Sequence, residues 1–370
     1  MAASIAALPE TPGIYSFTVR GNAPHLSSSK SLKRRLKRLL VPSYTASPND
    51  GSPPAAKFVL FGQFRENVDR VDCWFTASRL ETSLLMYELA RSYYPKEYLK
   101  RLRLRLPWFV GTDSADPFPR LEIVNRPSAK STAVYGPFLS RDLAQRYEQE
   151  VLGLFQLRRC TEVLAPHAGH PGCIYGEMNQ CLRPCQCAVT PQEYASEAER
   201  VSEFLASNGK SAVATLSAAR QRASAELDFE QAAQIHKRLE RVAAAAACRD
   251  QAITAVDKFN GIALTRGFGN RQFRLWPMLT GYWQDPVNID IPLEEAHAKP
   301  LDHEIRESLT PALSVVHTEG HRAEHLALFS RWYYSSWRDG HWFPFRALPD
   351  LNYRRLVREM SNLAKTAGPC

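Results

Sequence analysis

The chain has 370 residues, enough for about two to four domains, and its content of 44% hydrophobic and 23% charged residues is ordinary for a soluble globular protein. It contains no apolar run of the roughly 18 residues that a membrane-spanning helix needs, and no basic stretch followed by an apolar core at its start. We therefore expect a cytoplasmic protein without a membrane partner. The net charge of +9 indicates a polyanionic partner.

A short strand and a strongly basic helix are predicted near the start of the chain. Residues 12–17 have the pattern of a strand after a turn, and four leucines at 32, 36, 39 and 40 then recur at helical spacing. Six cations in nine residues, with no acid among them, lie on the remaining face of this helix: Lys30, Lys33, Arg34, Arg35, Lys37 and Arg38. Such a face suits phosphate groups, and a merely solvated helix face is the alternative.

A second strand and helix pair is predicted before residue 105. Residues 42–54 indicate a loop, and residues 57–61 and 71–76 indicate strands. Residues 78–93 predict an amphipathic helix whose apolar positions are Leu80, Leu84, Leu85, Leu89 and Tyr93. A second run of cations follows Pro95, in which we expect Lys100, Arg101 and Arg103 to contact a polyanion together with the first run.

A connector is predicted between residues 106 and 150, and we assign no chemistry to it. It contains a strand at 120–124, a turn at 135–138 and a helix that begins at residue 141 and leads into the first of a group of cysteines at residue 160.

Five of the eight cysteines lie between Cys160 and Cys187. Four follow the spacing C-x12-C-x7-C-x3-C, at Cys160, Cys173, Cys181 and Cys185. Four thiolates at short range can hold a zinc ion or an iron–sulfur cluster. A zinc ribbon usually has two short C-x-x-C knuckles, which this segment lacks, so the irregular gaps favour a cluster over zinc. Buried reduced thiols that bind no metal are the third interpretation.

A helical region with an unpartnered apolar stripe is predicted after the cysteines. Thr190, Pro191 and Glu193 have the pattern of a helix start, and this helix should end near Gly209. Residues 210–247 then form helices interrupted only at 226–230, which predicts a hairpin of two arms. A lone hairpin buries little surface, so we expect a partner on its apolar residues, with docking on its own chain as the alternative. The expected contacts are Leu227, Phe229, Ala232, Ala233, Ile235 and Leu239.

The last 120 residues predict a small α+β region. Strands are expected at 253–256, 261–265 and 272–276, and a helix at 324–337. The aromatic residues of this helix favour core packing over stacking on nucleic-acid bases. They are Phe329, Trp332, Tyr333, Tyr334 and Trp337.

The cysteine segment resembles that of UvrC, the excision-repair endonuclease subunit. It reads LFQLRRC at 154–160, PGC at 171–173 and CLRPC at 181–185, where the family reads LFPLRTC, RPC and GRC-x-x-PC. The resemblance implies a 4Fe–4S cluster on Cys160, Cys173, Cys181 and Cys185, with zinc as the alternative and Cys187 as a spare cysteine.

The segment ELDFE at 226–230 resembles the UVR motif of the same family, which is a helix hairpin that pairs UvrC with UvrB. The resemblance implies a UvrB-like partner. His236 and Lys237 replace the usual Arg-Asp pair of the motif, which would alter partner choice.

The order of the N-terminal elements, with Gly13-Ile14-Tyr15 first, resembles a GIY-YIG nuclease domain, the N-terminal module of UvrC. Tyr15 matches the family's first tyrosine, which helps deprotonate a metal-bound water. Arg35 matches the arginine that stabilises the scissile phosphate. The family's second tyrosine is His25 here, and the glutamate that holds a divalent cation is Met86.

The change at Met86 puts the nuclease in doubt. A thioether is a poor ligand for a hard cation such as Mg²⁺ or Mn²⁺. Glu88 lies about 200° around the helix from position 86, and Glu81 lies more than one turn away, so neither should replace the lost ligand. We expect a non-catalytic nuclease fold. Compensation by His25 or Glu88 in an active site is the alternative.

The resemblance covers roughly residues 10–280 and leads to one main hypothesis and two alternatives. The main one is a UvrC-like DNA-binding protein of nucleotide excision repair, with an inactive nuclease fold and a structural cluster. The alternatives are an active endonuclease that makes a single incision and needs Mg or Mn, and a protein adaptor that acts through the hairpin. From the length of 370 residues we do not expect the family's RNase H-like and helix–hairpin–helix domains in this sequence.

The expected fold class is a multidomain α+β chain. We expect a degenerate GIY-YIG domain with a small mixed sheet at 1–105, a connector at 106–150, a cysteine-rich cluster segment at 151–190, a helical region with the UVR hairpin at 191–250, and a small α+β domain at 251–370.

Overall fold

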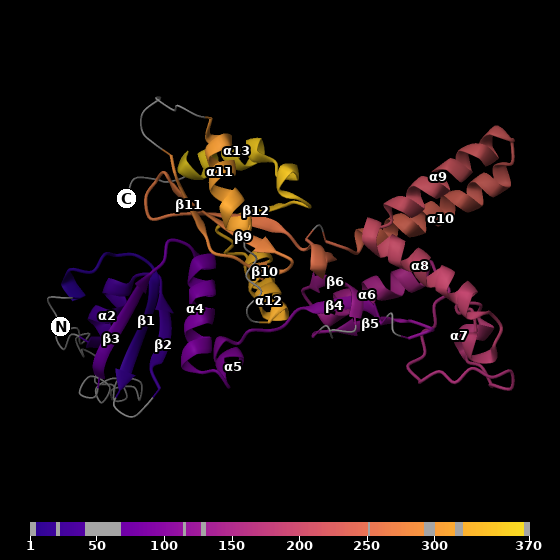
Figure 1. Ribbon diagram of the computed structural model, residues 1–370, viewed down its shortest axis with the longest axis horizontal. Helices are drawn as coiled ribbons and strands as arrows, with labels where there is room; N and C mark the ends of the chain where they lie inside the picture. Colours follow the sequence, from indigo (N-terminus) through magenta and orange to yellow (C-terminus); the bar gives the residue numbers. More distant parts are fainter. Residues whose placement is uncertain are drawn as a thin grey trace, which may run out of the picture.

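The structure, a computed structural model shown in Figure 1, describes residues 5–19, 23–40, 68–113, 116–126, 131–250, 252–291, 300–314 and 321–365. Within these ranges the chain forms three sheets and eleven α-helices, a multidomain α+β fold as predicted. The predicted loop at 42–54 and strand at 57–61 lie outside the described residues. Among the described residues, no helix is both long and apolar enough to cross a membrane.

The first sheet has the strand order β2-β1-β3, from β1 (Gly13–Val19), β2 (His25–Ser29) and β3 (Val68–Phe75). Both pairings described in it are antiparallel, so the predicted mixed sheet is wrong for the described strands. The short connection between β1 and β2 permits only antiparallel pairing of those two strands. Helix α2 (Leu32–Leu40) packs Leu32, Leu36 and Leu39 on this sheet, so its predicted apolar face is confirmed. A Cβ at Gly13 would clash with the carbonyl oxygen of Trp74, so this position needs glycine.

Helix α4 (Arg79–Tyr93) begins where the Ser78 side chain accepts a hydrogen bond from the Glu81 backbone N–H. A short helix, α5 (Tyr98–Leu102), follows it. The buried positions of α4 differ from the predicted stripe: Leu80, Glu81, Leu84, Tyr87 and Ala90 are buried, whereas Leu85, Leu89 and Tyr93 are half-buried. The reason is that α4 lies between the first sheet and the C-terminal half of the chain, so no single face is its core face (Figure 1).

The predicted connector forms a second sheet with a core of its own. Its strands are β4 (Trp108–Asp113), β5 (Leu121–Val124), β6 (Ser131–Phe138) and β7 (Thr254–Ala255), in the order β5-β4-β6-β7. Helix α6 (Arg141–Leu152) contributes Tyr147, which is fully buried against Phe138. Since β7 follows the helical hairpin in the chain, this sheet joins segments from both sides of the cysteines and the hairpin.

Three helices lead away from the second sheet (Figure 1). Helix α8 (Pro191–Ser207) begins with the predicted capping box, in which Thr190 and Glu193 exchange hydrogen bonds. Its last residue is Ser207, with Asn208 as the C-cap, which agrees with the predicted end near Gly209. Helices α9 (Lys210–Ala225) and α10 (Phe229–Ala247) then form the predicted hairpin and project away from the body of the molecule.

The C-terminal sheet has the order β10-β9-β8-β12, with β11 also paired to β9. Its elements are β8 (Gly261–Arg266), β9 (Gln272–Leu279), β10 (Tyr282–Trp283), β11 (Val287–Asp290) and β12 (Gly340–Pro344), with helices α11 (Leu301–Ser314), α12 (Arg322–Tyr333) and α13 (Tyr353–Lys365). Phe329 and Trp332 of α12 are fully buried, which confirms the prediction of core packing for this aromatic face.

The N-terminal and C-terminal halves share one core. Leu80, Leu84 and Tyr87 of α4 belong to the same cluster of buried side chains as Trp276 and Trp332. At its edge the Glu324 carboxylate accepts hydrogen bonds from the hydroxyls of Tyr87 at 2.7 Å and Tyr98 at 2.9 Å. Helix α12 is therefore fixed against α4 and α5 by both apolar and polar contacts.

Candidate nucleic-acid interface and cysteine site

The two residues that match the nuclease motif are in direct contact. Arg35 Nε donates a hydrogen bond to the Tyr15 hydroxyl oxygen at 3.1 Å. Tyr15 is only 1% exposed, and its ring packs on Phe17 at a centroid distance of 5.2 Å. Because Phe17 is paired with His25 across the strands, and directly paired residues share a sheet face, His25 lies on the same face as Tyr15. The structure thus brings together Tyr15, Arg35 and His25.

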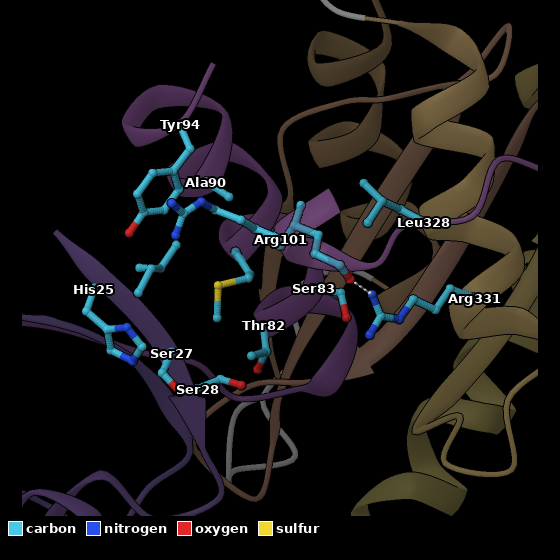
Figure 2. Close-up of a pocket in the computed structure, with 13 residues that line it drawn as sticks. His25, Ser27, Ser28, Thr82, Ser83, Ala90, Tyr94, Arg101, Leu328 and Arg331 are labelled. Carbon is cyan, nitrogen blue, oxygen red and sulfur yellow. Dashed lines mark hydrogen bonds between the residues drawn. The ribbon is translucent and has the colours of Figure 1, made fainter. Parts of the chain in front are cut away.

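Met86 lines a pocket of about 430 Å³ beside the edge strand β2 (Figure 2). The pocket walls come from β2, α4, α5 and α12, and include the hydroxyl-bearing residues Ser27, Ser28, Thr82 and Ser83. Two arginines complete them: Arg101 of α5 and Arg331 of α12. No carboxylate stands among the described residues that line this pocket, so its donor chemistry differs from that of a divalent-cation site.

The two acids of α4 are engaged elsewhere, as their helical positions predict. Glu88 lines a different pocket together with Asp285, and partial burial, followed by the charge of Asp285, raises its pKa. Glu81 is buried, accepts a hydrogen bond from the Ala77 backbone N–H at 2.7 Å and forms an ion pair with Arg274 of β9. Neither carboxylate lines the pocket that contains Met86.

The cations of the two basic runs lie at the surface on both sides of β2. Seven of the nine are exposed and two are half-buried. The exposed ones are Lys30, Arg34, Lys37, Arg38, Lys100, Arg101 and Arg103, and the half-buried ones are Lys33 and Arg35. The pKa of His25 is lowered first by desolvation and then by the positive charges of Arg101 and Arg35, one from each basic run. The potential beside β2 is therefore positive, as a phosphate-binding surface requires.

One acid outside the basic runs reduces this charge. Glu10 forms an ion pair with Arg34 at 2.8 Å, and both side chains are more than half exposed. Exposed pairs of this kind contribute only about 0–1 kcal/mol, so a phosphate can displace the carboxylate at small cost.

Four of the clustered cysteines interact electrostatically with one another. Cys181 and Cys185 are buried, and Cys160 and Cys173 are half-buried. Burial raises the pKa of Cys181, opposed by the Arg183 backbone N–H, with further increases from Cys160, Cys173 and Cys185. Cys187 is exposed and is not among the cysteines that shift the pKa of Cys181. Among the described residues, no three His, Cys, Asp or Glu side chains stand in metal-holding geometry.

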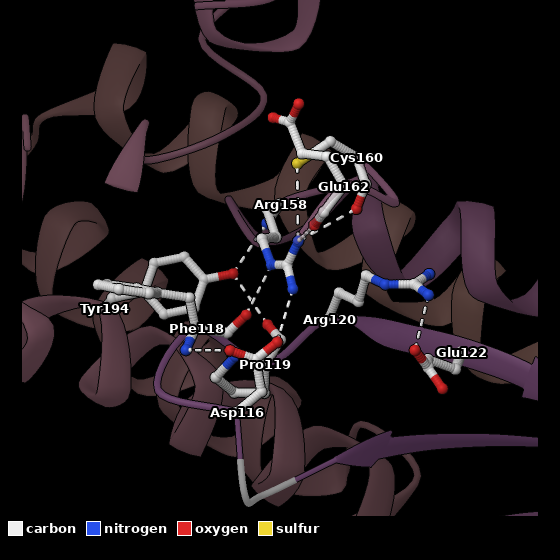
Figure 3. Close-up of polar contacts among 9 residues, drawn as sticks. All are labelled: Asp116, Phe118, Pro119, Arg120, Glu122, Arg158, Cys160, Glu162 and Tyr194. Carbon is white, nitrogen blue, oxygen red and sulfur yellow. Dashed lines mark hydrogen bonds and ion pairs between the residues drawn. The ribbon is translucent and has the colours of Figure 1, made fainter. Parts of the chain in front are cut away.

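Arg158 fastens the cysteine segment to the second sheet (Figure 3). Its guanidinium is buried and forms an ion pair with Asp116 at 2.6 Å. It also donates to the Phe118 carbonyl oxygen at 2.6 Å, the Glu162 carbonyl oxygen at 3.0 Å and the Cys160 sulfur at 3.8 Å. Sequence reasoning assigned Arg158 no role. The available signal was a pair of arginines directly before a cysteine, which does not distinguish Arg158 from Arg159, whose guanidinium donates to the Leu152 carbonyl oxygen.

The hairpin separates its six predicted contact residues into two groups. Leu227 and Phe229 at the tip are 72% and 66% exposed, and Ala233 is also exposed. The other three are half-buried and follow a helical spacing that continues to the buried Val242, so they face the seam between the arms. These three are Ala232, Ile235 and Leu239. Leu227 also has a left-handed backbone conformation with φ of 62°, which is unusual for a residue with a branched side chain.

Part of the chain matches a known protein family. Residues 106–204 match the family model described as UvrC/Cho excinuclease, middle domain, which covers strands β4, β5 and β6 of the second sheet, the five clustered cysteines and most of α8, but not β7. The matched range begins where the predicted connector begins, at residue 106. The division of the chain into five domains stays a prediction.

Several curated relatives are proteins described as UvrABC system protein C. The protein of Lacticaseibacillus casei is 30% identical over 234 residues, which are 63% of this chain and 36% of that protein. The corresponding protein of Lawsonia intracellularis is 28% identical over 237 residues, 64% of this chain and 36% of that protein. The corresponding protein of Arthrobacter is 26% identical over 231 residues, which are 62% of this chain and 33% of that protein. The chain spans about a third of the length of these relatives. No solved structure matches it.

Proposed function

We propose that this UvrC-like chain binds DNA in nucleotide excision repair through a nuclease-type fold that does not hydrolyse it. The observation that carries the proposal is the surface beside β2. Two basic runs flank this strand, while the position expected to hold a metal carboxylate is Met86, in a pocket whose described lining contains no carboxylate. Phosphates are attracted to such a surface, but a catalytic cation finds no carboxylate ligand among the described residues of the pocket.

The alternative of an active endonuclease has one supporting contact, the hydrogen bond between Arg35 and Tyr15. A tyrosine that is 1% exposed is poorly placed to deprotonate a metal-bound water. His25 is on the same sheet face, but a single imidazole does not replace the oxygen ligands of a hard cation.

The experiment that tests this function uses two readouts on one purified sample. Fluorescence anisotropy with a labelled duplex in EDTA should show binding that weakens linearly in log affinity with log salt. Gel analysis of the same mixture after addition of Mg²⁺ or Mn²⁺ should show an intact duplex. Absence of binding in low salt would contradict the proposal, as would metal-dependent cleavage.

A structural 4Fe–4S cluster on Cys160, Cys173, Cys181 and Cys185 is part of the proposal, with zinc as the alternative. Four thiols are the donor type that a cluster takes, they interact electrostatically with one another, and two N–H groups are directed at them; among the described residues their side chains do not stand in metal-holding geometry. The Arg183 backbone N–H lies 3.4 Å from the Cys181 sulfur, and an Arg158 N–H lies 3.8 Å from the Cys160 sulfur. Such N–H contacts stabilise thiolates in metal and cluster sites. When bound, the cluster would cross-link the segment.

Replacing Cys181 with alanine is expected to remove the cluster's visible absorbance and to lower stability by several kcal/mol, because a buried ligand and the cross-link are lost together. The matched control is Cys187→Ala, an exposed cysteine six residues along the same segment, which should leave both properties unchanged. Iron, sulfide and zinc analysis of the purified protein measures the content directly. Stoichiometric zinc, or equal effects of the two substitutions, would contradict a cluster on this set.

We assign the hairpin tip as the docking surface for a UvrB-like partner. The apolar residues at the tip, Leu227 and Phe229, are exposed, while the seam residues already pack between the two arms. A hairpin docked on its own chain is disfavoured, since α9 and α10 project away from the body of the molecule (Figure 1). The proposed contact set is therefore narrower than the six residues of the sequence prediction.

Changing Leu227 and Phe229 to serine is expected to weaken binding of a UvrB-like hairpin at least about tenfold, because exposed anchors dominate small apolar interfaces. Thermal stability should change little, since exposed positions contribute within about 0.5 kcal/mol. Titration calorimetry measures the first effect and circular dichroism the second. Val213→Ser, an exposed position nearer the hairpin base, is the control and should bind normally. Undiminished binding by the double variant would show that the tip is not the docking surface.

A further inference from the structure

We propose that the pocket beside β2 is a metal-independent phosphate site for the DNA backbone, built jointly by the two halves of the chain, with Arg101 and Arg331 as its cationic ligands. The inference rests on the proposed DNA-binding function and deepens it, because it names the group that is bound and the residues that bind it. Arg331 belongs to neither basic run and lies far along the chain from the nuclease-like domain.

The chemistry of the pocket lining suits a phosphate group. Arg101, Arg331 and the imidazole of His25 supply N–H donors, and Ser27 and Ser28 supply hydroxyls from the edge strand (Figure 2). Phosphate oxygens accept such hydrogen bonds and are repelled by carboxylates, which are absent from the described lining. The volume of about 430 Å³ exceeds what one phosphate group fills, so part of the adjoining sugar can also enter.

The two hydroxyls that α4 contributes to the pocket lining already donate hydrogen bonds within the helix, so they are not donors for a ligand. The Thr82 hydroxyl bonds to the Ser78 carbonyl oxygen at 2.9 Å, and the Ser83 hydroxyl donates to the Arg79 carbonyl oxygen at 2.9 Å. Hydrogen bonds to the phosphate must therefore come mainly from the arginines and from the β2 side of the pocket.

Both arginines are held in place by the fold while they stay exposed. Arg101 stacks on the ring of Tyr94 at 4.0 Å and also bonds to Glu97 at 3.2 Å, in a pair that is half exposed on both sides. Arg331 donates one N–H to the Leu102 carbonyl oxygen at 3.1 Å, as the dashed line in Figure 2 marks. A guanidinium carries five N–H donors, so this single bond fixes the direction of Arg331 without using up its capacity to bind an anion.

The C-terminal half supplies one of the two arginines only because α12 is docked on α4 and α5. Glu324, at the start of α12, accepts the hydroxyl hydrogen bonds of Tyr87 and Tyr98, and Leu328 of the same helix lines the pocket. The nuclease-like domain alone would present an open groove with Arg101 on one side. Docking of α12 closes this groove with a second guanidinium, so phosphate binding is a property of both halves.

The test measures salt-dependent binding of a labelled duplex in EDTA by fluorescence anisotropy. The samples are the full chain, Arg101→Gln, Arg331→Gln and the double variant. Each single substitution is expected to lower affinity about tenfold at low salt and to reduce the slope of log affinity against log salt by about 0.9, with roughly twice that loss of slope in the double variant. Arg331→Lys keeps the charge and should keep the slope. The control is Arg354→Gln, an exposed arginine of α13 outside the pocket.

The outcomes separate this inference from the proposed function. If the double variant binds with the affinity and slope of the control, the pocket is not a phosphate site, while DNA binding by the chain stands. If the unaltered protein does not bind DNA, both proposals fail. Duplexes with and without terminal phosphates show which phosphate the pocket binds. An equal loss of affinity in the variants on both duplexes indicates a backbone phosphate. A loss of affinity confined to the phosphorylated duplex indicates a phosphate at a strand end. Circular dichroism confirms that each variant is folded.

Discussion

Reversing the charges of Arg34, Lys37 and Arg38 to glutamate is expected to reduce DNA affinity by roughly a hundredfold or more at low salt, because each lost phosphate contact lowers the salt slope by about 0.9 and each new carboxylate adds repulsion. The structure makes this a clean test. All three side chains are exposed on α2, whereas the buried residues of that helix are leucines, so the fold should persist. Arg35 is left unchanged because it is bonded to Tyr15.

The chain offers a matched control on another helix. Arg354, Arg355 and Arg358 of α13 are also exposed, and their reversal changes the net charge by the same amount. If attraction at long range were responsible, both triple variants would lose affinity equally. Our proposal requires that the loss on α2 be much larger. Equal losses would show that the overall positive charge, rather than the surface beside β2, holds the DNA.

The elements that sequence reasoning predicted well are those fixed by local chemistry. The basic helix α2 follows from the spacing of its leucines, and the start of α8 follows from the capping pattern of Thr190, Pro191 and Glu193. The hairpin of α9 and α10 follows from a long run of helix formers with one interruption. In each case the signal lies within one helix or its cap, where neighbours along the chain decide the conformation.

The second sheet shows what local patterns cannot reveal. The predicted connector forms most of that sheet, but its fourth strand is β7, which lies beyond the cysteines and the hairpin. Pairing between segments so far apart depends on tertiary packing, which leaves no periodic mark in either segment. The predicted boundary at residue 251 consequently falls just before a strand that completes the sheet of an earlier domain.

The candidate site was predictable only where its residues belong to one local motif, because contacts between distant segments leave no mark in the sequence. Tyr15, Arg35 and His25 follow from the motif, and the structure brings them together on one face of the first sheet. Arg331 could not be found from sequence, because its position beside Met86 depends on the docking of α12 against α4. That docking includes apolar packing and the hydrogen bonds of Glu324, a buried carboxylate whose partners Tyr87 and Tyr98 lie more than two hundred residues away in the chain.

Under the proposed function, the methionine at position 86 accounts for DNA binding without hydrolysis. A divalent cation in such a site needs oxygen ligands, and a phosphate beside it needs the cation to offset its charge. With Met86 in that position, the pocket instead gathers arginines, which attract phosphate without a metal. In the proposed account, methionine at this position removes hydrolysis and leaves a surface that suits DNA.

The central claim is that this fold binds DNA without hydrolysing it, and a nicking assay with Mg²⁺ or Mn²⁺ tests it most directly. The unaltered protein is compared with Tyr15→Phe and Met86→Glu on a damaged duplex, with binding measured on the same samples. We expect binding but no cleavage by the unaltered protein, and the same result for Tyr15→Phe. Cleavage gained in Met86→Glu would identify the missing carboxylate as the main loss. Cleavage by the unaltered protein that disappears in Tyr15→Phe would contradict the account, because it would mean that another ligand replaces the glutamate and that the site is an active nuclease.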